Sequence, residues 1–435
     1  MKPDALLKKF RDEDLVIGIL GLGYVGLPLA MVFAGKGCRT LGFDIDRKKT
    51  ATLRKGESYI QYVDPEKIRR LFDDGFFEAT HDLKRLGEPD VLIICVPTPL
   101  NEHREPDLRY ITSTVEEISK QLRPGQLVVL ESTTYPGCTR EVLLPALSCT
   151  GLRLDEDFFV AFSPEREDPS NPVFHTQNIP KLVGGVTPLS GDLAEAVYSR
   201  VLESVVRVST AEVAESAKLL ENIFRCVNIA LVNEMKVTLD QMGIDIWEVI
   251  DAAATKPFGF MPFYPGPGLG GHCIPIDPFY LAWKARACGS ETRFIELAGE
   301  VNRSMPSYVV RKIFLALNEE GKAVRGSRVL LIGFSYKKNL GDDRESPAYD
   351  ILEELCKMGA SVVYHDPFLP TVSPTRQHQV SRHSLDLSPE ELRRADCVVV
   401  LTDHDAVDFE LVLEHAGLIV DTRNACRRPG KYFSA

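Results

Sequence analysis

The sequence contains no C-x-x-C pair, although ten cysteines are distributed over its 435 residues. Cysteines without this spacing give no framework for a tetrahedral zinc site, so we expect no metal site. The first 14 residues are charged and lack the apolar segment of a secretory leader, and no apolar run approaches the ~18 residues of a membrane-spanning helix. These absences predict a cytoplasmic protein in a reducing compartment, without a membrane partner.

The chain also lacks an excess of positive charge. It has 51 basic and 62 acidic residues, which gives a formal net charge of -11. A general nucleic-acid-binding function is excluded on this ground, because phosphate binding needs a basic face. One basic pocket on an acidic protein is still able to hold a small anionic ligand. At roughly 100–200 residues per domain, the length predicts two or three domains.

Short apolar runs alternate with helix-compatible segments in two regions of the chain. This pattern is typical of buried parallel strands in a doubly wound α/β sheet. The first region holds runs at 15–20, 91–96, 127–130 and 158–162, and the second holds runs at 328–333, 361–364, 397–401 and 418–421. We therefore predict an α/β protein with two Rossmann-like doubly wound lobes.

A long helix is predicted between the two lobes. Residues 212–242 include no proline or glycine, and their apolar side chains recur at helical spacing. The helical region continues to about residue 305. A largely apolar helix needs a partner surface, either within the chain or on a second subunit. We favour the second subunit, and hence a homodimer or a higher homo-oligomer.

A G-x-G-x-x-G motif follows the first apolar run, at Gly21-Leu22-Gly23-Tyr24-Val25-Gly26. The first glycine allows a tight turn, the second lets the backbone approach a pyrophosphate, and the third lets helix and strand pack closely. Asp44 ends the next strand 18 residues after Gly26 (44−26), where a carboxylate accepts from ribose hydroxyls and repels a 2′-phosphate. The motif predicts NAD as the cofactor. Gly333 follows the first strand of the second lobe without the full motif, so that lobe binds a nucleotide differently or binds none.

The segment 265–278 is the most unusual in the chain, because four glycines shortly precede Cys273. Such a loop could wrap closely around a ligand, with Cys273 as a nucleophile and Asp277 as a base. The alternative is a tight structural turn with an incidental thiol. We assign no role to His272, because lone histidines more often pack or form hydrogen bonds.

Other polar groups stand at positions suited to catalysis. Lys218 and Asn222 are spaced i, i+4, so they share one face of the long helix and could together polarise a carbonyl oxygen. The alternative is two solvated side chains. The segments 132–137 and 163–169 each follow a strand, where hydroxyls and a carboxylate could position a water molecule or simply form turns.

Taken together, these segments resemble the UDP-glucose/GDP-mannose dehydrogenase family nearly from end to end. The motifs that carry the resemblance are GLGYVGLPLA (21–30), VPTP (96–99), STTYPG (132–137), SPEREDP (163–169), AKLLEN (217–222), GPGLGGHCIPIDP (266–278), FSYKKN (334–339), DDRESPA (342–348) and DTRN (421–424). The resemblance implies an NAD-binding domain at 1–205, a central helical dimerisation region at 206–305 and a UDP-sugar-binding domain at 306–435.

The resemblance also implies a four-electron oxidation of a sugar C6 alcohol to a carboxylate, with two NAD consumed. Cys273 matches the nucleophile that forms a thiohemiacetal, which is oxidised to a thioester and hydrolysed. Lys218 and Asn222 match the residues that stabilise the oxyanion, and Asp277 matches an aspartate that helps proton transfer through water. A fixed cation also favours the thiolate form of a cysteine.

Further matches concern the hydrolytic water and the ligands. Thr133 and Glu165 match the residues that hold the water, with Glu165 as the base. The expected cofactor-binding residues are Gly21, Gly23, Tyr24, Val25, Gly26, Asp44, Arg47, Thr98, Thr133 and Arg344. The expected substrate-binding residues are Glu165, Lys218, Asn222, Gly270, Lys337 and Arg423.

Two departures from the UDP-glucose enzymes bear on the substrate. Ile276 stands where many of them have a lysine, and SPEREDP replaces their PEFL-type segment. SPEREDP together with STTYPG most resembles the branch that oxidises UDP-N-acetylglucosamine, with UDP-N-acetylmannosamine, UDP-N-acetylgalactosamine and UDP-glucose as alternatives. A one-step hydroxyacid-type dehydrogenase or a nucleotide-binding sensor needs neither Cys273 nor its glycine loop, so both are less favoured.

Overall fold

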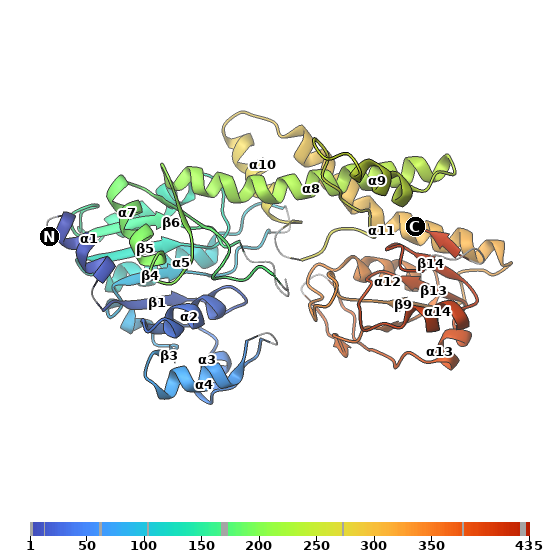
Figure 1. Ribbon diagram of the computed structural model, residues 1–435, viewed down its shortest axis with the longest axis horizontal. Coiled ribbons are helices and arrows are strands. Elements are labelled where there is room, and N and C mark those ends of the chain that lie inside the picture. Colours follow the sequence, from blue (N-terminus) through green and yellow to red (C-terminus); the bar gives the residue numbers. More distant parts are fainter. Residues whose placement is uncertain are drawn as a thin grey trace. The chain divides into compact units, whose positions relative to one another are not determined.

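The computed structural model describes residues 3–12, 14–60, 63–101, 104–166, 173–271, 274–375, 378–426 and 432–435. The chain divides into two compact units, one of residues 1–221 and 279–290, the other of residues 222–278 and 291–435. Both units combine helices with a largely parallel sheet (Figure 1). No helix in the described ranges has the length and apolar character needed to cross a membrane.

The first unit is built on a sheet with the described strand order β3-β2-β1-β4-β5-β6-β7-β8. Neighbouring strands are parallel except β6 and β7, which pair antiparallel. The strands are β1 (Val16–Leu20), β2 (Arg39–Phe43), β3 (Phe77–Thr80), β4 (Val91–Ile94), β5 (Gln126–Leu130), β6 (Phe158–Phe162), β7 (Lys181–Gly185) and β8 (Val205–Val208). The four strands predicted for this region are confirmed, and the reversal of strand order between β1 and β4 creates the crevice in which such sheets bind ligands.

Burial explains why these strands could be predicted from the sequence. Every residue of β4, β5 and β6 is buried, because helices cover both faces of a parallel sheet, and this requires continuous apolar runs. The surrounding helices are α1 (Pro3–Asp12), α2 (Gly26–Gly35), α3 (Arg47–Arg54), α4 (Pro65–Asp73), α5 (Arg109–Gln121), α6 (Leu144–Ser148) and α7 (Pro188–Tyr198). Asp46 caps α3 and Thr187 caps α7 by accepting from backbone N–H groups of the first turn.

The second unit contains a parallel sheet with the described strand order β10-β9-β13-β14-β15. Its strands are β9 (Arg328–Ile332), β10 (Ser361–His365), β13 (Cys397–Val400), β14 (Ile419–Asp421) and β15 (Tyr432–Ser434), and β11 (Thr371–Val372) pairs separately with β12 (Arg382–His383). Helices α12 (Pro347–Lys357), α13 (Pro389–Arg394) and α14 (Phe409–His415) alternate with the strands (Figure 1). The predicted second α/β lobe is confirmed.

Helix α8 (Ala211–Gln241) is the predicted long helix, and it is followed by α9 (Ile246–Ala254), α10 (Asp277–Ala287) and α11 (Arg293–Glu319). Its first part, to Glu221, belongs to the first unit, and its remainder belongs to the second. Large apolar side chains on α8, including Phe224 and Leu231, are exposed in the single chain. The described part of the chain therefore leaves some apolar side chains of α8 uncovered, as expected for a helix that needs a further partner surface.

Candidate functional site

The G-x-G-x-x-G segment forms a tight turn between β1 and α2. Gly21 has φ +94°, and a side chain there would place Cβ 2.5 Å from the carbonyl oxygen of Cys95. A Cβ at Gly26 would lie 1.9 Å from the carbonyl oxygen of Gly21, whereas a Cβ at Gly23 would meet no described atom within 4 Å. The first and third glycines therefore allow close packing, and the second leaves an open approach to the N-terminus of α2, as a pyrophosphate requires.

Asp44 is held beside this turn at the end of β2. Its carboxylate accepts hydrogen bonds from the N–H groups of Leu22 at 3.0 Å and Asp46 at 2.9 Å. Lys49 lies 3.3 Å from one carboxylate oxygen. Because a carboxylate has about four acceptor positions, Asp44 retains capacity for a ribose hydroxyl. The adjacent Arg47 begins α3 and is exposed.

Two further predicted cofactor residues follow strands of the same sheet. Thr98 follows β4 and Thr133 follows β5, and both are half-buried. Ser132, next to Thr133, donates through its hydroxyl to the carbonyl oxygen of Val96 at 2.8 Å. This bond links the two loops at the carboxyl edge of the sheet, where a ligand of a doubly wound sheet lies.

A buried glutamate on α8, Glu215, holds the STTYPG segment. Its carboxylate accepts from the N–H of Gly137 at 2.6 Å, from the N–H of Thr139 at 2.9 Å and from the Thr139 hydroxyl at 2.6 Å. Burial raises the pKa of Glu215 to about 7, although these hydrogen bonds oppose the rise. Sequence reasoning did not identify this residue.

Lys218, one helical turn after Glu215, contacts the second predicted loop. Its ammonium group donates to the backbone carbonyl oxygen of Glu165 and lies 3.5 Å from the Glu165 carboxylate. The structure therefore brings together two residues that were predicted from separate motifs. Their side chains are only 6% and 13% exposed, so their interaction is weakly screened by solvent.

Arg166 fastens the same loop at its next residue. Its guanidinium forms an ion pair with Glu221 of α8 at 2.7 Å and donates to the carbonyl oxygen of Pro180 at 2.7 Å. Glu221 stands three residues after Lys218, so the two contacts hold consecutive residues of the loop against consecutive turns of one helix. Sequence reasoning missed this pair, because the partners are 55 residues apart.

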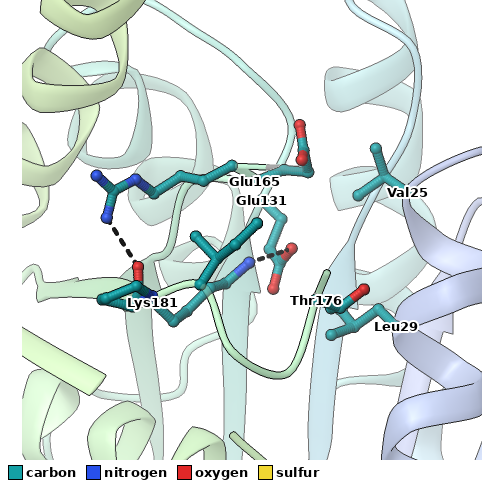
Figure 2. Close-up of a pocket in the computed structure, with 9 residues that line it drawn as sticks. Val25, Leu29, Glu131, Glu165, Thr176 and Lys181 are labelled. Atoms are coloured by element: carbon teal, nitrogen blue, oxygen red, sulfur yellow. Dashed lines mark hydrogen bonds and ion pairs between the residues drawn. The ribbon is translucent and has the colours of Figure 1, made fainter. Parts of the chain in front are cut away.

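A pocket in the first unit adjoins Glu165 (Figure 2). Val25 and Leu29 form one wall, and a buried ion pair between Lys181 and Glu131, 2.8 Å long, lies opposite. Glu131 also accepts from the hydroxyl of Tyr198. The remaining lining residues are Arg166, Thr176, Ile179 and Pro180. The pocket thus places a paired cation and carboxylate beneath the turn that carries Glu165.

In the second unit, Asn222 donates from its side-chain amide to the carboxylate of Asp277. Both side chains are buried, and Asp277 is the first residue of α10. Cys273, the predicted nucleophile, and His272 lie outside the described residues. Asn222, which was predicted to act with Lys218, is thus also joined to the segment 265–278 through Asp277.

The glycine-rich segment before Cys273 packs against side chains of the second lobe. A Cβ at Gly266 would lie 2.6 Å from a guanidinium nitrogen of Arg423, and Cβ atoms at Gly270 and Gly271 would lie 2.4 and 2.8 Å from Tyr336. We expected these glycines to admit a ligand to the backbone. In the structure they admit Tyr336 and Arg423, which brings the predicted substrate-binding Gly270 and Arg423 to one loop.

The other predicted residues of the second unit lie near this loop in sequence or contact. Lys337 follows Tyr336 and is half-buried. The Arg344 guanidinium donates hydrogen bonds to both oxygens of the Asp342 carboxylate. The carbonyl oxygen of Arg344 accepts from the N–H of Gly271 at 2.9 Å. Within the described residues, no group of three or more His, Cys, Asp or Glu side chains is placed to hold a metal ion.

Buried polar side chains of α8 hold neighbouring segments in each of the two units. Glu215, Lys218 and Asn222 lie three and four residues apart; Glu215 and Lys218 each hold a loop of the first unit, and Asn222 holds the first residue of α10 in the second unit. Asn233, farther along, accepts from the N–H of Gly266 at 3.0 Å and donates to Asn302 at 2.9 Å. The predicted pair Lys218 and Asn222 is therefore part of a longer polar stripe.

Comparison with known families divides the chain into three matched regions. Residues 15–202 match the NAD-binding domain of the UDP-glucose/GDP-mannose dehydrogenase family, residues 212–304 match its central domain, and residues 330–428 match its UDP-binding domain. All nine motifs that carry the resemblance in the sequence lie within these matched ranges.

Individual relatives are similar over most of their length. A UDP-N-acetyl-D-glucosamine 6-dehydrogenase of Pseudomonas aeruginosa is 38% identical over 85% of this chain and 86% of its own. A UDP-N-acetyl-D-mannosamine dehydrogenase of Pyrococcus horikoshii is 32% identical over 95% of this chain and 96% of its own. A solved structure of UDP-D-ManNAc dehydrogenase from Pyrococcus horikoshii superposes with a TM-score of 0.86 at 30% identity, covering 96% of this chain and 98% of that one.

Proposed function

This chain belongs to the UDP-glucose/GDP-mannose dehydrogenase family, and on that premise we propose that it oxidises UDP-N-acetylglucosamine to UDP-N-acetylglucosaminuronic acid. It is an NAD-dependent nucleotide-sugar dehydrogenase, since the NAD-binding and UDP-binding domains of the family are both present. The SPEREDP and STTYPG segments and the 38% identical relative favour the N-acetylglucosamine derivative.

The residues of the first unit fit NAD. The open approach at Gly23 and the carboxylate of Asp44 match a pyrophosphate and an adenosine ribose. NAD, when bound, accepts a hydride in each of the two oxidations. The further contacts that we assign to it are made by Tyr24, Val25, Arg47, Thr98 and Thr133 of this unit, and by Arg344 of the second unit.

Lys218 and Asn222 supply the charge stabilisation. An alkoxide is generated when the alcohol is oxidised and again when the thiohemiacetal is oxidised. The Lys218 ammonium and the Asn222 amide donate to that oxygen, in surroundings where burial strengthens the interaction. The observation that carries the proposal is this spacing on α8, with Lys218 bound to Glu165 and Asn222 bound to Asp277.

Cys273 is the proposed nucleophile. Its thiolate adds to the C6 aldehyde, forming a carbon–sulfur bond, and the resulting thiohemiacetal loses a hydride and a proton to become a thioester. Asp277 assists the proton transfers through a water molecule. Lys218 also favours the thiolate by its positive charge.

Glu165 and Thr133 complete the reaction by hydrolysis. The Glu165 carboxylate removes a proton from a water molecule that Thr133 helps to hold, and the water oxygen attacks the thioester carbon. The carbon–sulfur bond breaks, the thiolate of Cys273 is regenerated and the carboxylate product leaves. In total the alcohol and one water lose two hydrides and three protons.

The substrate is held mainly by the second unit. Lys337 and Arg423 provide positive charge for the diphosphate of the nucleotide sugar. The backbone at Gly270 lies against Tyr336, the residue before Lys337. Glu165, Lys218 and Asn222 contact the sugar. UDP-N-acetylmannosamine is the second candidate, because a 32% identical relative is named for it; UDP-N-acetylgalactosamine and UDP-glucose are further alternatives.

A second copy of the chain covers the apolar side of the central helices in this proposal. Leu231 is 57% exposed and Phe294 is 80% exposed, and exposed apolar side chains of this kind mark association surfaces. The expected assembly is a homodimer or a multiple of it. Sedimentation of wild type and Leu231→Asp tests this, with dimer expected for the first and dissociation for the second.

The decisive experiment measures NADH released per sugar with five substrates in parallel: UDP-N-acetylglucosamine, UDP-N-acetylmannosamine, UDP-N-acetylgalactosamine, UDP-glucose and GDP-mannose. We expect about two NADH per sugar, with UDP-N-acetylglucosamine preferred. Cys273→Ala should abolish acid production. A preference for another sugar overturns the substrate assignment, and acid production by Cys273→Ala overturns the covalent mechanism.

A further inference from the structure

The turn after β1 and the turn after β9 are built alike, although the second lacks the G-x-G-x-x-G motif. In the first unit, the N–H of Gly21 donates to the carbonyl oxygen of Phe43 at 2.8 Å. In the second, the N–H of Gly333 donates to the carbonyl oxygen of His365 at 2.8 Å. Both glycines have positive φ, +94° and +79°. Each turn is thus tied to the end of the neighbouring parallel strand.

The likeness extends to an aspartate after that neighbouring strand. In the first unit Asp44 accepts from the N–H of Leu22, the residue after Gly21. In the second unit Asp366 accepts at 2.8 Å from the N–H of Phe334, the residue after Gly333. Each aspartate also accepts, at 2.9 Å, from the N–H two residues further along its own chain. The second lobe therefore retains the turn and carboxylate of a mononucleotide-binding unit.

The two carboxylates differ in what else they bind. Oδ2 of Asp366 accepts from the N–H and the hydroxyl of Ser335, each at 2.8 Å, and lies 3.1 Å from Nε2 of His404. The side chains of Asp366 and His404 are both 0% exposed. With the Phe334 N–H, four donors surround Oδ2, and the Phe368 N–H donates to Oδ1. These five donors fill the roughly four acceptor positions of the carboxylate. A ribose hydroxyl has no route to Asp366.

The protonation of His404 follows from its other neighbour. The backbone N–H of Asn339 donates to Nδ1 of His404 at 2.9 Å, so Nδ1 carries no proton. The ring is therefore neutral, and its proton is on Nε2, where it is donated to Asp366. Burial raises the pKa of Asp366, but the hydrogen bonds from His404 and the backbone outweigh this effect and hold the pKa below its usual range.

The hydrogen-bonded pair of Asp366 and His404 joins the two ends of one loop, Ser335–Asn339. Ser335 is bound to Asp366, and its carbonyl oxygen accepts from the Thr402 hydroxyl at 2.6 Å. Asn339 is bound to His404 and exchanges hydrogen bonds with Asp405. The middle of the loop carries Lys337, the residue we assign to the substrate.

We propose that His404 is a positioning residue that occupies the ribose-binding carboxylate of the second lobe and so preforms the Ser335–Asn339 loop for the UDP part of the substrate. The inference rests on the proposed function in assigning Lys337 to the substrate. A loop that is ordered before binding loses less conformational entropy on binding, so its benefit appears as affinity. The same occupation excludes a second dinucleotide from this lobe.

Three variants test the contacts that His404 and Thr402 make with Asp366 and the Ser335–Asn339 loop. His404→Asn retains an acceptor near the position of Nδ1, and His404→Gln retains a donor near the position of Nε2. Thr402→Val replaces the hydroxyl with a methyl group in a side chain of nearly the same shape. His383→Ala is the matched control, since His383 is exposed in the same lobe. The measurements are the Kd for UDP by calorimetry, the KM for the UDP-sugar and for NAD, kcat, and the number of NAD bound per chain.

We expect the Kd for UDP and the KM for the UDP-sugar to rise about 10-fold in both His404 variants and about 3-fold in Thr402→Val, with kcat and the KM for NAD changed less than about 2-fold. One NAD per chain should bind. Equal losses in kcat and in both KM values would indicate a structural role only and overturn the proposal. Wild-type UDP affinity in all three variants, or two NAD bound per chain, would also overturn it.

These outcomes are distinct from failure of the proposed function. If wild type turns over none of the five nucleotide sugars, the assignment of the reaction fails, whatever the variants do. If wild type turns over a UDP-sugar and the variants match it, only the role of His404 fails. Thermal unfolding of each variant identifies any loss caused by misfolding, and Thr402→Val keeps the test valid if the His404 variants are unstable.

Discussion

The Lys218 ammonium group binds both the backbone carbonyl oxygen and, at 3.5 Å, the carboxylate of Glu165. Lys218 is on helix α8 and Glu165 follows strand β6, so the contact fixes a loop residue to a rigid element. In the proposed reaction the two groups act in sequence, the cation on the oxyanion and the carboxylate on water. Because the two side chains are in contact, a substitution at either residue is expected to affect the position of the other.

Glu165→Gln should separate hydride transfer from hydrolysis. The glutamine retains the shape of the side chain but has no basic oxygen for the attacking water. We expect a burst of about two NADH per active site, followed by steady turnover reduced by roughly 10²–10⁴-fold. Rapid mixing gives the burst, and intact-protein mass spectrometry should show the sugar nucleotide attached to Cys273.

Glu221→Gln is the control for this prediction. It changes a carboxylate of α8 that pairs with Arg166, the residue after Glu165. It removes no proposed proton acceptor. It should produce acid without accumulating the adduct. Steady turnover of Glu165→Gln within about 2-fold of wild type, or the same adduct in Glu221→Gln, would contradict the role of Glu165.

The Asn222–Asp277 hydrogen bond predicts strong coupling between the two side chains. Asn222→Asp places two carboxylates face to face in a buried site, which should lower the free energy of unfolding by about 3–5 kcal/mol and kcat by at least about 10²-fold. The exchange variant Asn222→Asp with Asp277→Asn restores one donor and one acceptor. It should recover most of the stability but little activity, because the carboxylate is then on the wrong element.

A double-mutant cycle from chemical denaturation measures that coupling. The two single variants and the exchange variant give the interaction energy directly. Additive effects on stability would mean that the hydrogen bond does not join the two residues in solution. Full recovery of kcat in the exchange variant would exclude the assigned function of Asp277.

Residues whose partners are close in sequence were predictable. The spacing of Lys218 and Asn222 gave their common helix face, and the strand–glycine–helix pattern located the turn at Gly21. Glu215 and Arg166 were not predictable, because their partners are 76 to 78 and 55 residues away. A lone Glu or Arg carries no local signal of such contacts, which depend on how loops return to one helix.

Burial likewise determines which strands could be predicted. Strand β5 is buried on both faces and therefore forms a continuous apolar run. Strand β8 is the edge of its described sheet and is half-exposed, so its sequence Val-Val-Arg-Val lacks that signal. The glycine loop before Cys273 was identified, but its use by Tyr336 and Arg423 depends on tertiary packing.

Asp44→Asn should relax the preference for NAD over NADP. The carboxylate repels a 2′-phosphate, whereas Lys49 at 3.3 Å and the exposed Arg47 would attract one after the charge is removed. We expect the ratio of kcat/KM for NAD to that for NADP to fall about 10–100-fold. Asp46→Asn, which alters the cap of α3, is the control and should leave the ratio unchanged, as should any purely structural effect.

Glu215 predicts a pH dependence of stability that Glu215→Gln should remove. Its pKa is raised from an ordinary 4.5 to about 7 by burial, against the opposing hydrogen bonds from Thr139 and Gly137. A carboxyl with a higher pKa in the folded chain holds its proton more tightly when folded, so the free energy of unfolding falls as pH rises from about 4.5 to about 7 and is level above. The fall should be on the order of 3 kcal/mol relative to Glu215→Gln.

Glu212→Gln, one turn earlier on α8, is the matched control because the shift there has the opposite sign. Burial raises the pKa of Glu212, but the hydrogen bond from Arg140 outweighs it and the pKa is lowered. That stabilisation is present above the ordinary value of 4.5 and is lost as pH falls below it. Denaturant unfolding at pH 5, 6, 7 and 8 should therefore show a slope in the wild type minus Glu215→Gln difference and none in the wild type minus Glu212→Gln difference. Two flat differences would mean that Glu215 is ionised throughout, held by its three donors, and that burial does not control it.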